Sequence, residues 1–381
     1  MIPIPKHSSV SAVASSSSSC DSDNQNYSHL INPNIIIIIM ISISQRTQTS
    51  GGLTSIPTAY NYFTPNNIHD QPVSDELFED SIPTIDFSLL TSGTPEQRSK
   101  IVNELGKACQ DWGFFLVINH GVPDSLMKVM IETCEEFFKL TEEKKQEYAG
   151  KHILDPIFYG TSINGAATQV LFWRDFIKFF VRPKFHCPAK PTGFRDISME
   201  YSKRTWEVAR ELMKGISMSL GLEEGYIEKA MNLDSGLQIV AANLYPPCPE
   251  PKVAIGLPPH SDHGLLTLLI HNGQRGLQVQ HKGNWVNVYS NPNAFVVNIG
   301  DHMEILSNGK YKSAFHRALV NGTDARISIP ILFGPELETV VNPAPELVDN
   351  ETNPPAFAGM KYREYLEMLQ AKTINAKLSQ K

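Results

Sequence analysis

The sequence of 381 residues is poor in cysteine and has no excess of basic residues. Its five cysteines, Cys20, Cys109, Cys134, Cys187 and Cys248, are odd in number, widely spaced and without a CxxC pair. This pattern fits reduced thiols better than a disulfide framework or a zinc finger. Lysine and arginine total 33 against 40 aspartate and glutamate, a net charge of −7. We therefore expect neither nucleic acid nor an anionic membrane surface as a partner.

No apolar run in the sequence is long enough to cross a bilayer. The isoleucine run at 35–39, extended through Met40, Ile41 and Ile43, has about half of the roughly 20 residues that a membrane helix needs. It begins too far from Met1 for a signal peptide, and no basic region precedes it. Residues 1–50 hold 13 serines, as in plastid transit peptides, but arginine is scarce there. We expect a disordered N-terminal extension over 1–75 and a cytoplasmic protein, with a plastid location as the alternative.

Regular patterning begins near residue 81. Apolar residues at helical spacing predict helices at 101–112, 127–137, 199–220 and 361–372, and short apolar or alternating runs predict strands at 81–87, 114–119, 265–270, 277–280 and 294–299. Many short strands between glycine and asparagine turns favour a β-sandwich or barrel. We expect a mainly β fold with flanking helices, divided into a helix and strand region at 80–225, a β-rich core at 238–340 and a helical segment at 341–381.

One short segment carries a pattern typical of a metal site. In an extended strand, residues two apart project to the same side, so His260 and Asp262 could bind one ion. His316, 54 residues further on, is the candidate third ligand. Two histidines and one carboxylate on one face of a metal form the facial triad of non-haem Fe(II) oxygenases.

A cationic side chain is predicted close to this site. His316 lies in the segment 313–320, which runs into Asn321-Gly322, a strong hairpin signal. The return strand would carry Arg326 and Ser328 on one face. An arginine among isoleucines looks buried and then needs an anionic partner. The spacing suits a five-carbon dicarboxylate that chelates the metal at one end and meets Arg326 at the other.

These residues belong to a longer set of motifs. In chain order the set consists of Ile82-Pro83-Thr84-Ile85-Asp86, Trp112-Gly113-Phe114-Phe115, Asn119-His120-Gly121-Val122, Asn243-Leu244-Tyr245-Pro246-Pro247-Cys248-Pro249, His260-Ser261-Asp262-His263, Asn298-Ile299-Gly300-Asp301, the run from Leu306 to Ser313, and Arg326-Ile327-Ser328. With these motifs, residues from about 80 to 370 resemble the plant 2-oxoglutarate/Fe(II)-dependent dioxygenases of specialised and hormone metabolism.

The resemblance implies a double-stranded β-helix (jelly-roll) core at 238–340, covered by the N-terminal helices. It implies Fe(II) held by His260, Asp262 and His316. It also implies 2-oxoglutarate held by Arg326 and Ser328, with Asn243 and Tyr245 helping to seat it. Ascorbate is the reductant that we expect, and a small-molecule substrate and O2 are the expected partners. For the oligomeric state a monomer is the default.

Residues that contact the substrate are harder to identify. By resemblance, the segment with Phe158, Tyr159, Phe172 and Trp173 lines the mouth of the pocket, and Phe333 could stack on an aromatic or terpenoid skeleton. A role as ordinary core aromatics is equally consistent with the sequence.

The predicted function is hydroxylation, demethylation or desaturation of a small plant metabolite, with release of succinate and CO2, in specialised metabolism. Three alternatives stay open: a dioxygenase that modifies a hormone (gibberellin, auxin or salicylate), an oxidase of the same fold that does not use 2-oxoglutarate, and a non-catalytic metal-binding β-barrel. The last is disfavoured because structural metal sites are usually closed by four ligands.

Overall fold

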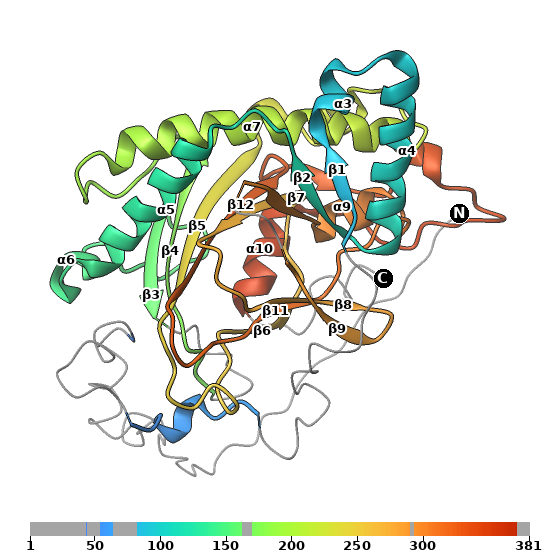
Figure 1. The fold of residues 1–381 in the computed structure, drawn as a ribbon. Coiled ribbons are helices and arrows are strands. Elements are labelled where there is room, and N and C mark those ends of the chain that lie inside the picture. Colours follow the sequence, from blue (N-terminus) through green and yellow to red (C-terminus); the bar gives the residue numbers. More distant parts are fainter. Residues whose placement is uncertain (1–42, 44–53, 64–81, 162–169, 290–292, 372–381) are drawn as a thin grey trace, which may run out of the picture. The chain divides into compact units, whose positions relative to one another are not determined.

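The structure, a computed structural model, describes residue 43 and residues 54–63, 82–161, 170–289 and 293–371 (Figure 1). Its helices are η1 (Thr58–Tyr60), α3 (Phe87–Ser92), α4 (Pro95–Asp111), α5 (Asp124–Lys139), α6 (Glu142–Gln146), α7 (Phe194–Ser219), α8 (Tyr226–Ala230), η3 (Leu233–Ser235), α9 (Asp301–Leu306), η4 (Pro345–Leu347) and α10 (Tyr362–Ala371). Its strands are β1 (Thr84–Asp86), β2 (Phe114–Ile118), β3 (Ile157–Thr161), β4 (Asp175–Arg182), β5 (Leu237–Tyr245), β6 (Leu257–His260), β7 (Leu266–His271), β8 (Leu277–His281), β9 (Asn284–Asn287), β10 (Phe295–Ile299), β11 (His316–Ala318), β12 (Arg326–Gly334), β13 (Val340–Val341) and β14 (Met360–Lys361).

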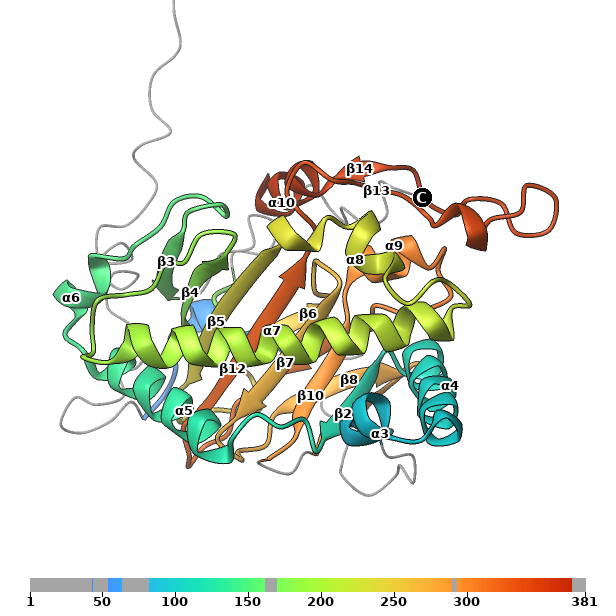
Figure 2. The ribbon, with the colours of Figure 1, turned by 90° about the horizontal axis from the view of Figure 1, so that it is seen from above.

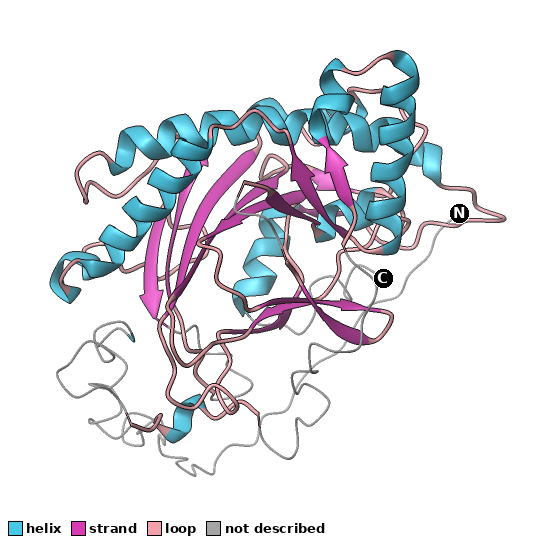
Figure 3. Ribbon diagram, in the orientation of Figure 1, coloured by secondary structure: helices cyan, strands magenta, loops and turns pink. Residues whose placement is uncertain are grey.

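Two sheets form the centre of the fold. The large sheet has eight strands in the order β1-β2-β10-β7-β12-β5-β4-β3, and the small sheet has four in the order β6-β11-β8-β9. In Figure 3 the small sheet lies opposite one face of the large sheet. One pocket is lined by side chains from both sheets, so the two inner faces look toward each other. This arrangement is the mainly β fold with a jelly-roll core that the sequence predicts.

Helices cover the outer face of the large sheet. Figure 2 shows α7 running across β5, β12, β7 and β10, with α4 and α5 beside it. The main hydrophobic core lies between these helices and the sheet, and it includes Trp206 and Leu212 of α7 and Ile329 and Ile331 of β12. A capping box begins α4, because Thr94 and Gln97 satisfy each other's backbone N–H. Within the described residues, we find no helix that is both long and apolar enough to cross a membrane.

The helices predicted from apolar spacing are confirmed as α4, α5, α7 and α10. The helix α7 begins earlier than the sequence pattern indicates, at Phe194, directly after Gly193, which has a φ of +84°. The strands predicted at 114–119, 265–270, 277–280 and 294–299 are confirmed as β2, β7, β8 and β10. The strand predicted at 81–87 is shorter, because the Asp86 side chain accepts a hydrogen bond from Ser88 N and starts α3 there.

The predicted hairpin between His316 and Arg326 is wrong. β11 pairs with β6 and β8 in the small sheet, whereas β12 pairs with β5 and β7 in the large sheet. The Asn321 side chain accepts hydrogen bonds from the backbone N–H groups of Thr323 and Asp324, and Asn321 O accepts from Cys248 N. The segment after β11 therefore forms a corner that passes from one sheet to the other, and no two-residue turn joins β11 to β12.

Disorder over the whole of 1–75 is also wrong in part. Residues 54–63 lie against the rest of the fold: Tyr62 N and Phe63 N donate to Val253 O, and Tyr60 is buried against Trp173 with ring centroids 5.2 Å apart. Apolar side chains in this segment explain the packing, since Ile56 and Tyr60 join one apolar cluster and Phe63 joins another. The remainder of the predicted extension lies outside the described residues, Ile43 excepted.

The predicted boundary near residue 238 does not coincide with a division of the large sheet, because strands from both sides of the boundary belong to it. The strands β1 to β4 come from the 80–225 region and are hydrogen-bonded into the same large sheet as β5, β7, β10 and β12. The division of the chain into four regions stays a prediction about sequence.

Side chains of β12 alternate between the two faces of the large sheet. Arg326, Ser328, Pro330 and Leu332 line the pocket, and the residues between them belong to the main core. Phe333 is fully buried in that core, with its ring centroid 5.8 Å from that of Trp206 on α7. Its predicted contact with substrate therefore conflicts with the structure: the strand periodicity turns Phe333 away from the pocket.

We expect Phe333→Ala to lower the free energy of unfolding by about 3–5 kcal/mol, because it removes a buried aromatic ring from a packed core. Urea denaturation followed by circular dichroism measures the change. Leu332→Ala, on the neighbouring half-buried position that faces the pocket, is the matched control and should cost clearly less. A Phe333→Ala protein of unchanged stability would contradict the assignment of Phe333 to the core.

Candidate active site

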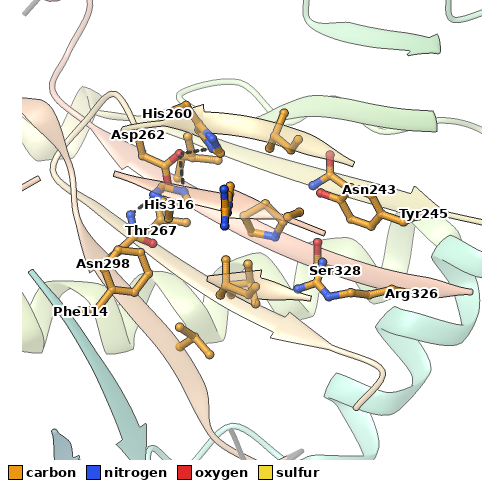
Figure 4. Close-up of a pocket in the computed structure, with 18 residues that line it drawn as sticks. Phe114, Asn243, Tyr245, His260, Asp262, Thr267, Asn298, His316, Arg326 and Ser328 are labelled. Carbon is orange, nitrogen blue, oxygen red and sulfur yellow. Dashed lines mark hydrogen bonds and ion pairs between the residues drawn. The ribbon is translucent and has the colours of Figure 1, made fainter. Parts of the chain in front are cut away.

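A pocket lies between the two sheets and brings together most of the predicted site residues (Figure 4). The space free of atoms in this pocket is about 520 Å³, part of which is open solvent. Its lining consists of Phe114, Asn243, Tyr245, Leu257, His260, Asp262, Thr267, Leu269, Leu277, Val296, Asn298, His316, Arg317, Ala318, Arg326, Ser328, Pro330 and Leu332.

His260, Asp262 and His316 form a compact cluster at one end of this pocket. His260 and His316 are direct partners in the antiparallel pair of β6 and β11. β6 ends at His260, so Asp262 lies in the loop that follows. The prediction that both residues lie on one extended strand is therefore wrong for Asp262. One ligand atom from each of the three residues lies within 4.8 Å of the others. In the described part of the chain, no other group of three such residues does so.

The Asp262 carboxylate is held in one orientation. Its Oδ2 accepts hydrogen bonds from Thr267 Oγ1 at 2.7 Å and from Asn298 Nδ2 at 3.0 Å. Its Oδ1 lies 3.7 Å from His260 Nε2 and 3.6 Å from His316 Nε2 (Figure 4). One oxygen is therefore occupied by the protein, and the other faces the two imidazoles as a single ligand atom.

The two imidazoles are oriented by backbone carbonyls. His260 Nδ1 lies 2.8 Å from Pro258 O, and His316 Nδ1 lies 3.2 Å from Ala314 O. A proton on each Nδ1 makes it the donor and leaves Nε2 free as a ligand, the arrangement usual for metal-bound histidine. Burial, with His316 next to it, lowers the pKa of His260 to about 3, so this imidazole is neutral at pH 7.

Asp262 is ionised in the same environment. Burial alone would raise the pKa of its carboxyl, but the two histidines and the hydrogen bonds from Asn298 and Thr267 together lower it to about 2. Two imidazoles and one carboxylate are a donor set that suits ferrous iron, and three ligands leave coordination positions for other groups. The cluster could therefore hold Fe(II).

A second group of polar side chains lines the pocket along β12 and β5. Arg326 and Ser328 are each 2% exposed, and they pair in register with Tyr245 and Asn243. The Arg326 Nε is buried without a hydrogen-bond partner among the described residues. Burial lowers the pKa of Arg326, because a charged guanidinium loses its hydration there. A buried cation with an unused donor, beside a hydroxyl and an amide, fits a carboxylate ligand.

Arg174, which no sequence pattern indicated, contacts one of the residues that line the pocket. It precedes β4, is 7% exposed, and donates from Nη1 to Asn243 Oδ1 at 3.0 Å. It also interacts electrostatically with Tyr245. The signal in the sequence is an arginine between Trp173 and Asp175, but nothing local shows that Asn243, 69 residues away, is its partner. Because Asn243 Oδ1 accepts from Arg174, the amide Nδ2 is left to donate elsewhere.

The residues predicted to contact substrate are not part of the pocket lining. Phe158 is half-buried on β3, with its ring 5.4 Å from that of Phe176. Tyr159 points to the other side of β3 and is buried against Phe137 of α5. Phe172 packs with Phe63 and Ile255 in a separate cluster.

Other histidines and acids that could be mistaken for site residues have structural contacts. His263 Nδ1 lies 2.7 Å from Tyr362 Oη, His302 Nδ1 accepts from Gly264 N, and His281 stacks on Trp112 with ring centroids 3.7 Å apart. Asp301 accepts hydrogen bonds from Tyr365 and Ser261, and Glu304 accepts from Ser313 N. These contacts explain why His263, His281 and His302 are absent from the three-residue cluster.

Comparisons with known proteins agree with this geometry. Residues 236–335 match the model of the 2OG-Fe(II) oxygenase superfamily, and residues 82–197 match that of the N-terminal region of non-haem dioxygenases in morphine synthesis. The chain is 45% identical to 2-oxoglutarate-dependent dioxygenase 19 of Oryza sativa subsp. japonica, over 78% of this chain and 88% of the relative. It is 37% identical to protein DMR6-LIKE OXYGENASE 2 of Arabidopsis thaliana, over 81% and 88%. The solved structure of JOX2 in complex with 2OG, Fe and JA superposes with a TM-score of 0.76 at 31% identity, over 87% of this chain and 93% of JOX2.

The chain therefore belongs to the plant 2-oxoglutarate/Fe(II)-dependent dioxygenase family, as the motifs indicate. It is a 2-oxoglutarate-dependent dioxygenase with the jelly-roll fold of that family, its cofactors are Fe(II) and 2-oxoglutarate, and it acts on a small molecule. This membership sets aside the oxidase that does not use 2-oxoglutarate and the non-catalytic metal-binding barrel.

The hydrogen bonds to Asp262 Oδ2 generate a prediction about metal affinity. We expect Thr267→Val or Asn298→Ala to weaken Fe(II) binding by about 10- to 100-fold, the usual effect of losing a group that orients a metal ligand. Calorimetric titration of the metal-free protein with Fe(II) in the absence of O2 measures it. Thr323→Val, at an exposed position on the loop after β11, is the control. Unchanged Fe(II) affinity in both pocket variants would contradict the orienting role.

Proposed function

We propose that this enzyme hydroxylates, demethylates or desaturates a small plant metabolite of specialised metabolism, and that it releases succinate and CO2. The observation that carries the proposal is the single pocket that holds both the His260, Asp262 and His316 cluster and the buried Arg326. Metal ligands at one end and a buried cation with an unpartnered Nε at the other match a co-substrate with two carboxylates.

In this proposal His260, Asp262 and His316 are the iron ligands. Arg326 and Ser328 bind the distal carboxylate of 2-oxoglutarate, and the buried Tyr245 and Asn243 hold it from the neighbouring strand. When bound, Fe(II) and 2-oxoglutarate together supply the activation of O2 and the oxidising equivalents for attack on a C–H bond.

The protein itself contributes positions and the exclusion of water. Thr267 and Asn298 restrict Asp262 to one ligand oxygen, and the carbonyls of Pro258 and Ala314 fix both imidazole rings. Apolar side chains such as Leu269, Val296 and Leu332 line the pocket and limit solvent around the reacting centre. The same machinery serves hydroxylation, demethylation and desaturation, which differ in the fate of the substrate.

The relatives support specialised metabolism and also keep the hormone alternative. A leucoanthocyanidin dioxygenase of Malus domestica is 34% identical over 84% of this chain and 93% of the relative, and its name gives leucoanthocyanidin as what it acts on. JOX2, in contrast, was solved with JA. We retain hormone modification as the second candidate. Ascorbate as reductant, a monomeric state and a cytoplasmic location belong to the same proposal.

We expect Asp262→Ala to abolish succinate formation, because the variant loses the only anionic ligand of the cluster. The experiment measures succinate and CO2 from 2-oxoglutarate with Fe(II), ascorbate and a panel of plant metabolites, and mass spectrometry reports the oxidised product. Asp324→Asn removes an exposed carboxylate on the loop before β12 and should leave turnover unchanged. Turnover by Asp262→Ala at the wild-type rate would refute the iron assignment.

Arg174 generates a separate prediction. We expect Arg174→Leu to raise the KM for 2-oxoglutarate by roughly tenfold with a smaller effect on kcat, because Asn243 and Tyr245 lose the group that orients them. Fe(II) affinity should not change, and Arg174→Lys should restore part of the loss. Arg182→Met, at the far end of β4, is the control. A fall in kcat at constant KM would contradict a positioning role toward the co-substrate.

A further inference from the structure

The inner face of β4 carries a cation that the proposed chemistry does not use. Side chains on a strand alternate, so Phe176, Lys178 and Phe180 share one face, whereas Ile177 and Phe179 pack into the core on the other. Lys178 lies at the centre of this inner face and is half-buried.

The sheet register connects Lys178 to the pocket. Lys178 is the partner of Ala241 on β5, and the pairing of β5 with β12 continues this row to Pro330, whose partner on β7 is Leu269. Pro330 and Leu269 both line the pocket. With strands about 4.8 Å apart, two steps of the sheet separate Lys178 from Pro330. Ala241 between them contributes only a methyl group.

The Lys178 ammonium lies among aromatic rings. Its Nζ is 5.6 Å from the ring centroid of Phe158 on β3 and 5.3 Å from that of Phe180, and it donates to the carbonyl oxygen of Ile153. Within the described chain it makes no ion pair with a carboxylate. The acid that acts on it electrostatically is Asp155. The Oδ2 atom of Asp155 already accepts hydrogen bonds from the backbone N–H groups of Lys151 and His152.

Burial lowers the pKa of Lys178 to about 8, since the charged form loses hydration. An anion beside it would offset this cost. Lys178 also acts electrostatically on His263, which follows Asp262 in the chain.

We propose that Lys178 anchors a carboxylate of the substrate, and that Phe158, half-buried beside it, packs against the flat body of the same molecule. The substrate class is then an organic acid with an aromatic or alicyclic body, held by its acidic end on β4 while the carbon to be oxidised reaches the metal cluster. This proposal rests on the proposed function, because it concerns the substrate of that site.

The test is a binding measurement on the full-length protein loaded with Fe(II) and 2-oxoglutarate in the absence of O2. Calorimetry compares acids with their neutral amides of nearly equal shape: benzoate with benzamide, cinnamate with cinnamamide, and indole-3-acetate with indole-3-acetamide. We expect at least one acid to bind roughly tenfold or more tightly than its amide, the usual value of a charge-assisted hydrogen bond. Lys178→Gln keeps a donor for Ile153 O but no charge, and it should remove the preference. Lys178→Arg should retain it.

Two controls separate this proposal from the proposed function. Lys151→Gln removes an exposed lysine on the neighbouring loop and should leave the preference intact. The affinity for 2-oxoglutarate should be the same in wild type and Lys178→Gln; a wild-type protein that does not bind 2-oxoglutarate would refute the proposed function instead. Wild type that binds 2-oxoglutarate but prefers no acid of the panel overturns the Lys178 anchor. An acid preference that survives in Lys178→Gln overturns it as well.

Discussion

The site depends on one carboxylate held between two sheets. His260 and His316 come from paired strands of the small sheet, whereas the side chains that fix Asp262, Thr267 and Asn298, come from β7 and β10 of the large sheet. A carboxylate in the interior is costly unless hydrogen bonds and opposite charge compensate it. Asp262 receives the hydrogen bonds from Thr267 and Asn298 only when the two sheets face each other, so the geometry of the metal cluster depends on the packing of the sheets.

The register of β12 is the second constraint. Arg326, Ser328, Pro330 and Leu332 face the pocket because the residues between them, ending with Phe333, are packed under α7. A slip of one residue would place the Arg326 guanidinium in the apolar core and the isoleucines in the pocket. The hydrophobic outer face of β12 therefore determines where its polar inner face lies. Arg326 reaches the pocket through this register, without the hairpin turn that the sequence predicted.

Sequence alone was sufficient for the parts of the molecule with local patterns. The helices α4, α5, α7 and α10 follow from apolar spacing. The cluster of His260, Asp262 and His316 follows from the HxD segment together with the longer set of motifs around it. The hairpin from His316 to Arg326 failed because an Asn-Gly pair is also compatible with a corner between sheets, and that choice depends on partners such as Cys248. Phe333 was misjudged although the alternation along the strand already places it on the face opposite Arg326 and Ser328. Arg174 was missed because its partner, Asn243, lies 69 residues away in the chain.

The charges around the pocket give a reason to expect an acidic substrate. Ferrous iron and Arg326 would together bring three positive charges, and Asp262 with the two carboxylates of 2-oxoglutarate would balance them. Arg174 and Lys178 then add positive charge on the same side of the large sheet, and neither makes an ion pair within 4 Å in the part of the chain that the structure describes. Arg174 is turned toward Asn243, and Lys178, which donates to the carbonyl oxygen of Ile153, is the cation that we propose for the substrate. The pocket would therefore favour an organic anion over a neutral molecule of the same shape, because a neutral ligand would bury Lys178 further without compensating its charge.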